Sequence, residues 1–574
     1  MSPSALGVER MQTSRRNLLR TGALLGAAVP AATLTPSPAA ARNAAATTPL
    51  RSNPFTLGVA SGDPAADGFV IWTRLALDPL ADDGLGGMPP KRQSVGWQVA
   101  TDPRFADVVR AGSVKALPES AHSVHVEVTG LEPGREYYYR FRTGRHLSPA
   151  GRSLTTPARG TTPAALAMAF VSCSNWQGGF FTAYRRLAEE RPDLILHLGD
   201  YQYEGPGRAG LPRRHAGPET VTLANYRQRQ AQYKTDPDLQ AAHAAAPWLA
   251  VWDDHEVDNN YADEIADRAV EQPGFVQRRA AAYQAYYENM PLRRTSIPRG
   301  PDLQLFRRIH WGDLATFHML DTRQYRDDQA AGDGYKDTPE ADLESRSLPG
   351  MEQERWLLDG FRQSTARWDL LGQQVFFGRR DSDPDPEVTK VSMDAWDGYR
   401  ASRRRITQGW VDAGVRNPVV LTGDVHAHWA SDLYVDYDDQ TTPVGSEFIT
   451  SSISSGGDGY DSPTGEHPWS AYNPNIRFWT NLRGYISTTI TPDSMTADYR
   501  CLPYVLEPGA PVFTRARFEL TDGERGMQQT LDAPTEPAPD PTRQPRRRSV
   551  TPRAKPAPDR RTIVRDTLRE EGAG

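Results

Sequence analysis

The 574-residue chain contains only two cysteines and lacks any long uninterrupted hydrophobic run. Cys173 and Cys501 are too few for a disulfide framework, and they are either bridged to each other or free thiols. The most apolar stretch, residues 21–34, is too short and too rich in Gly and Ala to span a bilayer, so we expect no transmembrane segment in the mature protein. The net charge of -6 does not indicate a nucleic-acid-binding protein.

The N-terminus has the pattern of a twin-arginine export signal. Arg15-Arg16 precede two leucines, a moderately apolar stretch follows, and small residues suit cleavage near Ala41. We therefore assign residues 1–41 to a signal peptide recognised by the Tat translocase and exclude them from the fold. The alternative is a frayed basic terminus. The export signal predicts a mature protein that is extracellular, cell-wall associated or periplasmic.

Residues 53–157 follow a polar linker and have the pattern of an all-β domain. Short segments such as 68–73 and 123–128 are apolar or alternate in polarity, and Gly, Pro and Asp turns separate them. Residues 129–141 resemble the E-to-F corner of a fibronectin type III sandwich, where a leucine fills the core and a Pro-Gly turn leads into an aromatic strand. We expect this domain to support, orient or bind, and not to catalyse.

From Leu166 the pattern changes to apolar strands that alternate with amphipathic helices, which predicts an α/β layered domain over residues 165–525. Two β-sheets flanked by helices would account for the later strands, at 447–452 and 483–499. The expected helices are 183–190, 223–233, 274–289 and 352–363, and the other expected strands are 166–172, 194–198, 248–252, 305–309, 314–320, 368–377 and 418–422. Residues 533–574 are rich in Pro and Arg, and we expect them to be disordered, with attachment to an anionic envelope as an alternative role.

Four of the predicted strands end in side chains of the kinds that bind metals. Because the carboxyl ends of strands meet at one edge of a sheet, these side chains are expected to form one site. The set comprises Cys173; Asp200 and Tyr203; Asp253, Asp254 and His255, with Asn259 and Asn260; and Asp424, His426 and His428.

The types of ligand in this set indicate which cations it would hold. A tyrosinate with a thiolate favours a ferric ion, whereas carboxylate and amide oxygens suit hard cations. Carboxylates this crowded would repel one another without cations, which argues for at least two ions sharing Asp200. Taken singly, each piece has a plainer alternative: a solvated strand end for Asp424 to His428, and a small buried apolar side chain for Cys173. His197, inside its strand, is expected to be a packed core residue.

The order of these motifs resembles that of the calcineurin-like metallophosphoesterases, most closely the PhoD-type alkaline phosphatases. The resemblance rests on GDYQY at 199–203, DDHE at 253–256 and GDVH at 423–426, and further on residues 59–64, 172–175 and 371–374. It extends from the export signal to about residue 500. By this resemblance the domain at 165–525 is a metallophosphoesterase domain that uses Fe³⁺ and Ca²⁺. The implied iron ligands are Cys173, Asp200, Tyr203 and His426, and the calcium side takes Asp200, Asp424 and either Asp254 or Asn259.

The expected chemistry is hydrolysis of phosphate esters. His255 is a candidate to stabilise or protonate the leaving oxygen. Arg323 and Arg379, with Arg380, follow strands and are candidates to bind phosphate through paired N–H donors. We therefore expect an exported alkaline phosphatase that releases phosphate from small organic monoesters and diesters. A phospholipase D-like or teichoic-acid phosphodiesterase is one alternative, and a secreted binding or adhesion protein with an inactive catalytic domain is another.

Overall fold

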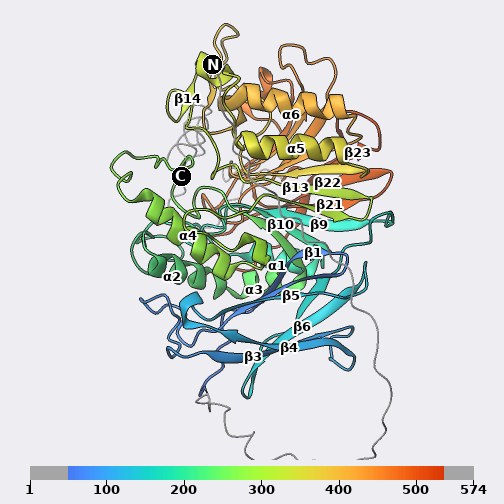
Figure 1. The fold of residues 1–574 in the computed structure, drawn as a ribbon. Helices are drawn as coiled ribbons and strands as arrows, with labels where there is room; N and C mark the ends of the chain where they lie inside the picture. The colour runs from blue at the N-terminus through green and yellow to red at the C-terminus, as the bar shows by residue number, and fades with distance from the viewer. Residues whose placement is uncertain (1–49, 536–574) are drawn as a thin grey trace, which may run out of the picture. The chain divides into compact units, whose positions relative to one another are not determined.

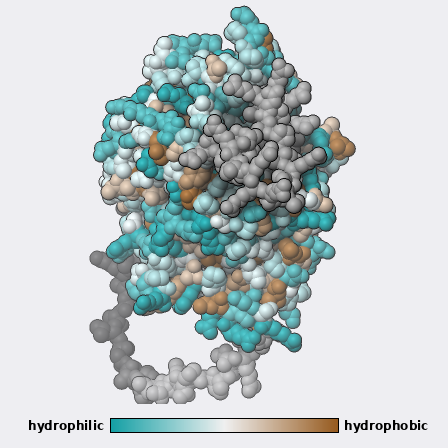
Figure 2. Space-filling model, turned by 180° about the vertical axis from the view of Figure 1, so that it is seen from behind, coloured by the Kyte–Doolittle hydropathy of each residue, from teal (hydrophilic) through white to brown (hydrophobic). Residues whose placement is uncertain are grey.

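The computed structural model describes residues 50–535. The predicted signal peptide at 1–41 and residues 536–574 of the predicted tail lie outside the described residues. Within them the chain has more strand than helix, and residues 50–535 belong to one compact unit. No helix in the described part is both long and apolar enough to cross a membrane. The face drawn in Figure 2 is mostly hydrophilic, with small separate hydrophobic patches.

The largest sheet has ten strands and contains Leu194–Leu198, the strand that precedes Asp200. That strand, β10, pairs in parallel with its neighbours on both sides and is buried along its whole length, which explains its apolar sequence. In spatial order the sheet consists of β24 (Gln528–Asp532), β23 (Phe513–Thr521), β22 (Ser494–Leu502), β21 (Arg483–Ile490), β9 (Leu166–Val171), β10 (Leu194–Leu198), β11 (Pro247–Val251), β1 (Val59–Ala65), β2 (Gly68–Arg74) and β5 (Ser123–Val128).

A second sheet of seven strands delivers Asp424 and His426. Its strand β17 is buried along its length, with Val419 and Leu421 in the main hydrophobic core and Val420 in a separate core under α5 and α6. In spatial order the sheet consists of β12 (Arg307–Trp311), β13 (Ala315–Met319), β15 (Trp368–Gly372), β17 (Pro418–Thr422), β19 (Gly445–Ile449), β18 (His428–Leu433) and β20 (Ile476–Thr480). The strands predicted at 305–309 and 314–320 are observed as β12 and β13, which pair antiparallel.

The two sheets pack against each other, since side chains from both belong to one continuous core. Helices cover the outer faces: α5 and α6 lie over the seven-stranded sheet, and α1 to α4 lie on the far side of the ten-stranded sheet (Figure 1). The helices are α1 (Thr182–Glu189), α2 (Leu223–Lys234), α3 (Pro237–Ala245), α4 (Phe275–Asn289), α5 (Met351–Gln363) and α6 (Arg400–Ala413). A short ladder joins β14 (Tyr335–Lys336) to β16 (Val391–Ser392).

The N-terminal strands share a sheet with the rest of the chain. One layer of the N-terminal domain is β1, β2 and β5, and β1 pairs in parallel with β11, so the ten-stranded sheet is continuous across the predicted domain boundary. The other layer, at the bottom of Figure 1, is β3 (Gln93–Ala100), β4 (Val108–Ala116), β6 (Glu136–Thr143), β7 (His146–Leu147) and β8 (Gly151–Leu154). Buried Asp63, at the end of β1, binds Arg307 at 2.7 Å and reinforces the junction.

Two predicted strands differ from those observed. The expected strand at 368–377 ends at Gly372. The side-chain amides of the next two residues, Gln373 and Gln374, are hydrogen-bonded to the hydroxyl groups of Thr422 and Thr322. The segment expected at 483–499 is two antiparallel strands, β21 and β22, joined by a turn at Thr491. Helices α3 and α6 were not predicted from the sequence.

Candidate functional site

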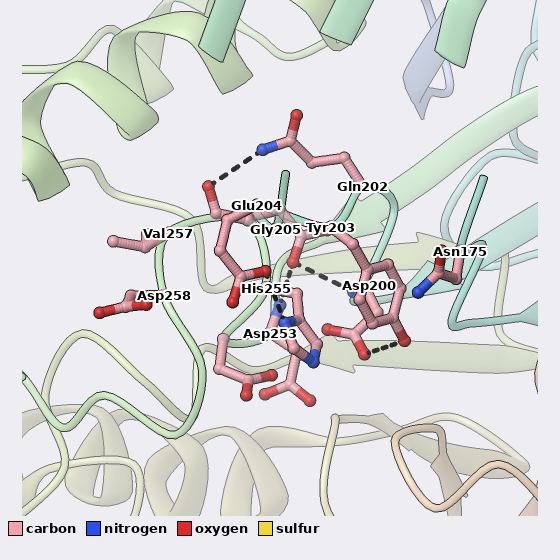
Figure 3. A network of polar contacts seen from close by, with 12 residues as sticks. Asn175, Asp200, Gln202, Tyr203, Glu204, Gly205, Asp253, His255, Val257 and Asp258 are labelled. Atoms are coloured by element: carbon pink, nitrogen blue, oxygen red, sulfur yellow. Dashed lines mark hydrogen bonds and ion pairs between the residues drawn. The ribbon is translucent and has the colours of Figure 1, made fainter. Parts of the chain in front are cut away.

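Four side chains from three different strand ends meet in a group that we call the cysteine cluster: Cys173, Asp200, Tyr203 and His426. Ligand atoms of Cys173, Asp200 and His426 all lie within 4.8 Å of one another. The Tyr203 hydroxyl donates to Asp200 Oδ2 at 2.8 Å, as Figure 3 shows, and lies 3.0 Å from His426 Nε2. The sheet edges therefore bring together residues 253 positions apart in the chain, from Cys173 to His426.

A second group, the aspartate cluster, consists of Asp200, Asp254 and His255. Their ligand atoms again lie within 4.8 Å of one another, and all three residues are buried. Asp200 belongs to both clusters, which is the arrangement that a bridging carboxylate requires. The sequence left the choice between Asp254 and Asn259 open; the Asp254 carboxylate lies in the group with Asp200, and Asn259 is half-buried in the turn that follows.

The backbone at these strand ends is strained. Cys173, Asp200, Asp424 and His426 have φ of 59°, 57°, 63° and 51°, in the left-handed region that residues other than glycine rarely adopt. Such strain persists only where the surrounding structure holds it, and it is concentrated at functional sites. It recurs at the ends of β9, β10 and β17, and three of these four residues, Cys173, Asp200 and His426, lie in the cysteine cluster.

Glu256 ties two of these strand ends together. Its buried carboxylate accepts the backbone N–H groups of Asp200 at 3.0 Å, Tyr201 at 2.5 Å and Asp253 at 2.9 Å. Burial raises the pKa of Glu256 to about 8, against the opposing effect of these N–H donors. Through these bonds one side chain sets the spacing between the turn after β10 and the turn after β11.

The electrostatics of both clusters call for positive charge. Burial raises the pKa of Cys173, Asp200, Tyr203 and Asp424 well above their ordinary values, and repulsion from neighbouring carboxylates adds to the shift in each case. Asp200 Oδ1 is buried without a hydrogen-bond partner among the described residues. A buried acceptor with no donor, beside a thiol, a phenol and an imidazole, fits a metal ligand better than a structural hydrogen bond.

His255 is held by Glu204, a residue that the sequence analysis did not single out. The His255 Nδ1 lies 2.8 Å from the Glu204 carboxylate, and its ring lies 4.1 Å from that of Tyr203, centroid to centroid. Burial opposes the charge on His255, but Glu204, Asp254 and Asp200 together raise its pKa well above the usual value. The position of Glu204, four residues after Asp200, carries no pattern that would have revealed this contact.

A cavity of about 660 Å³ opens above the clusters. Tyr203, His255 and His426 form part of its lining, and Ser455, which lies 2.8 Å from the Tyr203 hydroxyl, forms another part. This volume is within the range of pockets for small organic ligands, about 300–1,000 Å³.

Comparison with known proteins places this site in a family. Residues 168–499 match the model of the PhoD-like phosphatase, and residues 39–157 match that of the PhoD-like phosphatase N-terminal domain. The chain is 49% identical over 485 residues to alkaline phosphatase D of Bacillus subtilis (strain 168), covering 83% of this chain and 82% of that protein. The chain belongs to the PhoD-like phosphatase family.

The match to PhoD extends to the fold. A solved structure of PhoD superposes with a TM-score of 0.82 at 48% identity, covering 85% of this chain and 94% of that chain. GAP50, the anchor in the inner membrane complex of Plasmodium, gives a TM-score of only 0.32 at 10% identity, too weak to bear on fold or function. The predictions of PhoD-type membership and of a phosphoric ester hydrolase are confirmed, and the separate N-terminal domain is shown as well.

Arg323 and Arg379, two of the three arginines predicted to bind phosphate, are paired with carboxylates and do not line the cavity above the clusters. Arg323 is fully buried, and its guanidinium binds Asp253 at 2.5 Å and both oxygens of Asp394 at 2.8 and 2.9 Å. Arg379 pairs with Asp438 at 3.1 Å and lines a different cavity, none of whose lining residues belongs to the two clusters. The reason is that β15 ends at Gly372, which leaves six residues of irregular chain before Arg379.

The remaining candidates of this PhoD-like chain are placed as follows. Asp424 is half-buried and close enough to Asp253 and Asp254 for their charges to raise its pKa, although it is outside both clusters. His428 lies in β18, where its Nδ1 accepts the Ser451 N–H at 3.0 Å, a structural role. Cys501 is buried and, like Cys173, unbridged. Arg380 is buried, and its guanidinium lies 3.1 Å from the Tyr335 hydroxyl.

Proposed function

We propose that this chain is a metal-dependent phosphatase and phosphodiesterase that releases phosphate from organic phosphate esters. The observation that carries the proposal is the pair of clusters that share Asp200 beneath an open cavity. The family membership supports the same reaction class. An inactive domain retained only for binding would have no need to keep two buried acidic clusters and the strained backbone that shapes them.

The proposed ligands divide between two cations. Cys173, Asp200, Tyr203 and His426 would hold Fe³⁺, because a thiolate and a phenolate suit a ferric ion. Asp200, Asp254 and Asp424 would hold Ca²⁺ through carboxylate oxygens, with Asn259 as a further candidate. The raised pKa values and the unpartnered Asp200 Oδ1 support this assignment, since a cation would favour the ionised form of each group.

When bound, these cations would supply Lewis-acid stabilisation of the charge that develops on the phosphoryl oxygens. The roles of the chain's own residues follow from their positions. Glu204 orients His255 through Nδ1, which leaves Nε2 to face the site and give a proton to the leaving oxygen. Arg323 fixes Asp253 and Asp254 rather than contacting substrate, and Glu256 fixes the backbone that carries Asp200.

The domains and the location are part of the same proposal. Residues 53–157 form a fibronectin type III-like support, for which the Tyr137 hydroxyl accepting the Glu132 N–H at 3.0 Å is evidence, as in the tyrosine corner of such sandwiches. Residues 165–525 form the catalytic domain. Residues 1–41 direct export through the Tat translocase, so the enzyme acts outside the cytoplasm on small phosphate esters, with phospholipid and teichoic acid as alternative substrates.

The test compares hydrolysis of nitrophenyl phosphate, bis-nitrophenyl phosphate and phosphatidylcholine by protein whose iron and calcium have been measured. We expect activity on the first two, and an Asp200→Asn protein with kcat/KM reduced by more than the roughly 10–100-fold typical of a residue that only supports a ligand. Asp193→Asn, at the opposite end of β10, is the matched control and should stay active. A metal-free protein without activity after reconstitution, or a phosphatidylcholine rate above the other two, would overturn the proposal.

A further inference from the structure

Arg208 lines the cavity over the two clusters, whereas Arg323 and Arg379, which the sequence predicted to bind phosphate, do not. It lies in the irregular segment between β10 and α2, and it is the single Arg or Lys among the described residues that line the cavity over the two clusters. The turn is anchored, since the Arg208 backbone N–H donates to Gln177 Oε1 at 2.6 Å. The side chain itself is exposed.

The guanidinium of Arg208 is uncommitted, unlike those of its neighbours. Among residues 50–535 it has no hydrogen bond, ion pair or ring contact with another side chain. Nearby Arg213, by contrast, binds Asp236 at 2.6 Å and packs on the Trp176 ring, and Arg229 binds backbone carbonyls of Gly205 and Pro218. Arg208 therefore has its full set of N–H donors available to a ligand in the cavity.

The acidic groups that line the cavity form no ion pair with Arg208 among residues 50–535. Glu204 is paired with His255, and Asp458 Oδ1 accepts the backbone N–H groups of Val505 and Leu506 at 2.6 and 2.9 Å. The cavity, at about 660 Å³, holds far more than one phosphoryl group. The buried clusters account for the phosphoryl group, so the exposed Arg208 faces the part of the substrate that lies nearer to solvent.

We propose that Arg208 is a specificity-determining residue that binds a second anionic group, a carboxylate or phosphate, on the alcohol portion of the phosphate ester. Guanidinium recognises both groups through parallel N–H donors, which is why one site accepts either. This inference rests on the proposed function, because it names the substrate class of the same cavity. In this proposal Arg208 determines which phosphate esters are preferred, and it takes no part in the chemical step.

The experiment compares 3-phosphoglycerate with glycerol 3-phosphate. The two esters differ at one carbon, which is a carboxylate in the first and a hydroxymethyl group in the second. We expect the protein to prefer 3-phosphoglycerate, and Arg208→Gln to reduce that preference by roughly fivefold, the scale of one partly exposed charge pair. The loss should appear as a higher KM for 3-phosphoglycerate alone. Added salt should weaken the preference of the unmodified protein, since an exposed charge pair is screened.

Arg214→Gln is the matched control, because Arg214 is an exposed arginine of the same segment that does not line the cavity. Arg208→Lys keeps the charge but loses the planar guanidinium. Its preference for 3-phosphoglycerate should therefore lie between those of the unmodified protein and Arg208→Gln. An equal loss on both esters, or no change on either, in an Arg208→Gln protein that melts at the normal temperature would overturn the assignment. Absence of hydrolysis of both esters by the unmodified, metal-loaded protein would instead contradict the proposed function.

Discussion

Glu256 offers the sharpest test of how the fold holds its proposed ligands in place. The side chain is 2% exposed, and its two oxygens accept three backbone N–H groups, from Asp200, Tyr201 and Asp253. In Glu256→Gln the amide oxygen can replace Oε2, which serves two of these donors. The Tyr201 N–H then faces an NH₂ group and has no acceptor.

The cost follows from the number of donors left without a partner. One buried N–H group without an acceptor costs about 1–3 kcal/mol, so we expect Glu256→Gln to lower the free energy of unfolding by that amount. Glu256→Ala leaves three such donors and should be the more damaging change. Because two of the three N–H groups belong to the turns that carry Asp200 and Asp254, we also expect both variants to bind iron and calcium more weakly.

Urea unfolding and elemental analysis of the purified protein measure the two effects separately. Glu447→Gln is the matched control: Glu447 is fully buried and accepts the backbone N–H groups of Phe377 and Gly378 at 2.8 and 2.9 Å, but it does not hold the turns after β10 and β11. It should lose stability and keep its metals. If Glu256→Gln retained full metal content, or unfolded like the unmodified protein, the positioning role of Glu256 would be refuted.

Two further predictions concern the proposed iron ligands and the core of the large sheet. If Tyr203 and Cys173 bind ferric iron, the protein should absorb visible light, and Tyr203→Phe should weaken or shift that band; an unchanged spectrum would remove Tyr203 from the metal site. Burial lowers the pKa of His197 to about 3, so the unfolded chain takes up a proton near pH 6.5 while the folded chain does not. This one group should therefore lower stability by about 1.4 kcal/mol for each unit by which the pH drops from 6.5 toward 3, and His197→Gln should reduce the slope of stability against pH by that amount in unfolding measurements; an unchanged slope would contradict the assignment.

The strands that carry the site could be predicted because their sequences are dictated by burial. Leu194–Leu198 and Pro418–Thr422 are buried on both faces, so their apolar runs have nearly the observed bounds. The polar residue after each run marks where the strand leaves the sheet. The expected core position of His197 is also confirmed: the residue is fully buried, and its Nε2 lies 3.0 Å from the Tyr184 hydroxyl.

Side chains on irregular segments could not be placed in this way. Arg323 and Arg379 both follow strands, yet one is enclosed by Asp253 and Asp394 and the other pairs with Asp438 in another cavity. Arg208 does not directly follow a strand and lies in no motif, but it lines the cavity. Which arginine is free depends on the carboxylates that surround it, and these come from distant parts of the chain.

The sequence by itself determined the reaction class, the strand ends that would meet, and the types of ligand that would meet there. The reaction class came from the resemblance of the motifs to those of the PhoD-type phosphatases, and the strand ends could be predicted because buried parallel strands have a recognisable composition and their carboxyl ends converge on one edge. Only the tertiary structure decided that Glu204 holds His255, that Glu256 joins the turns, and that the N-terminal strands extend the catalytic sheet. These are contacts between segments far apart in the chain, made by backbone groups and single side chains, and no local pattern encodes them.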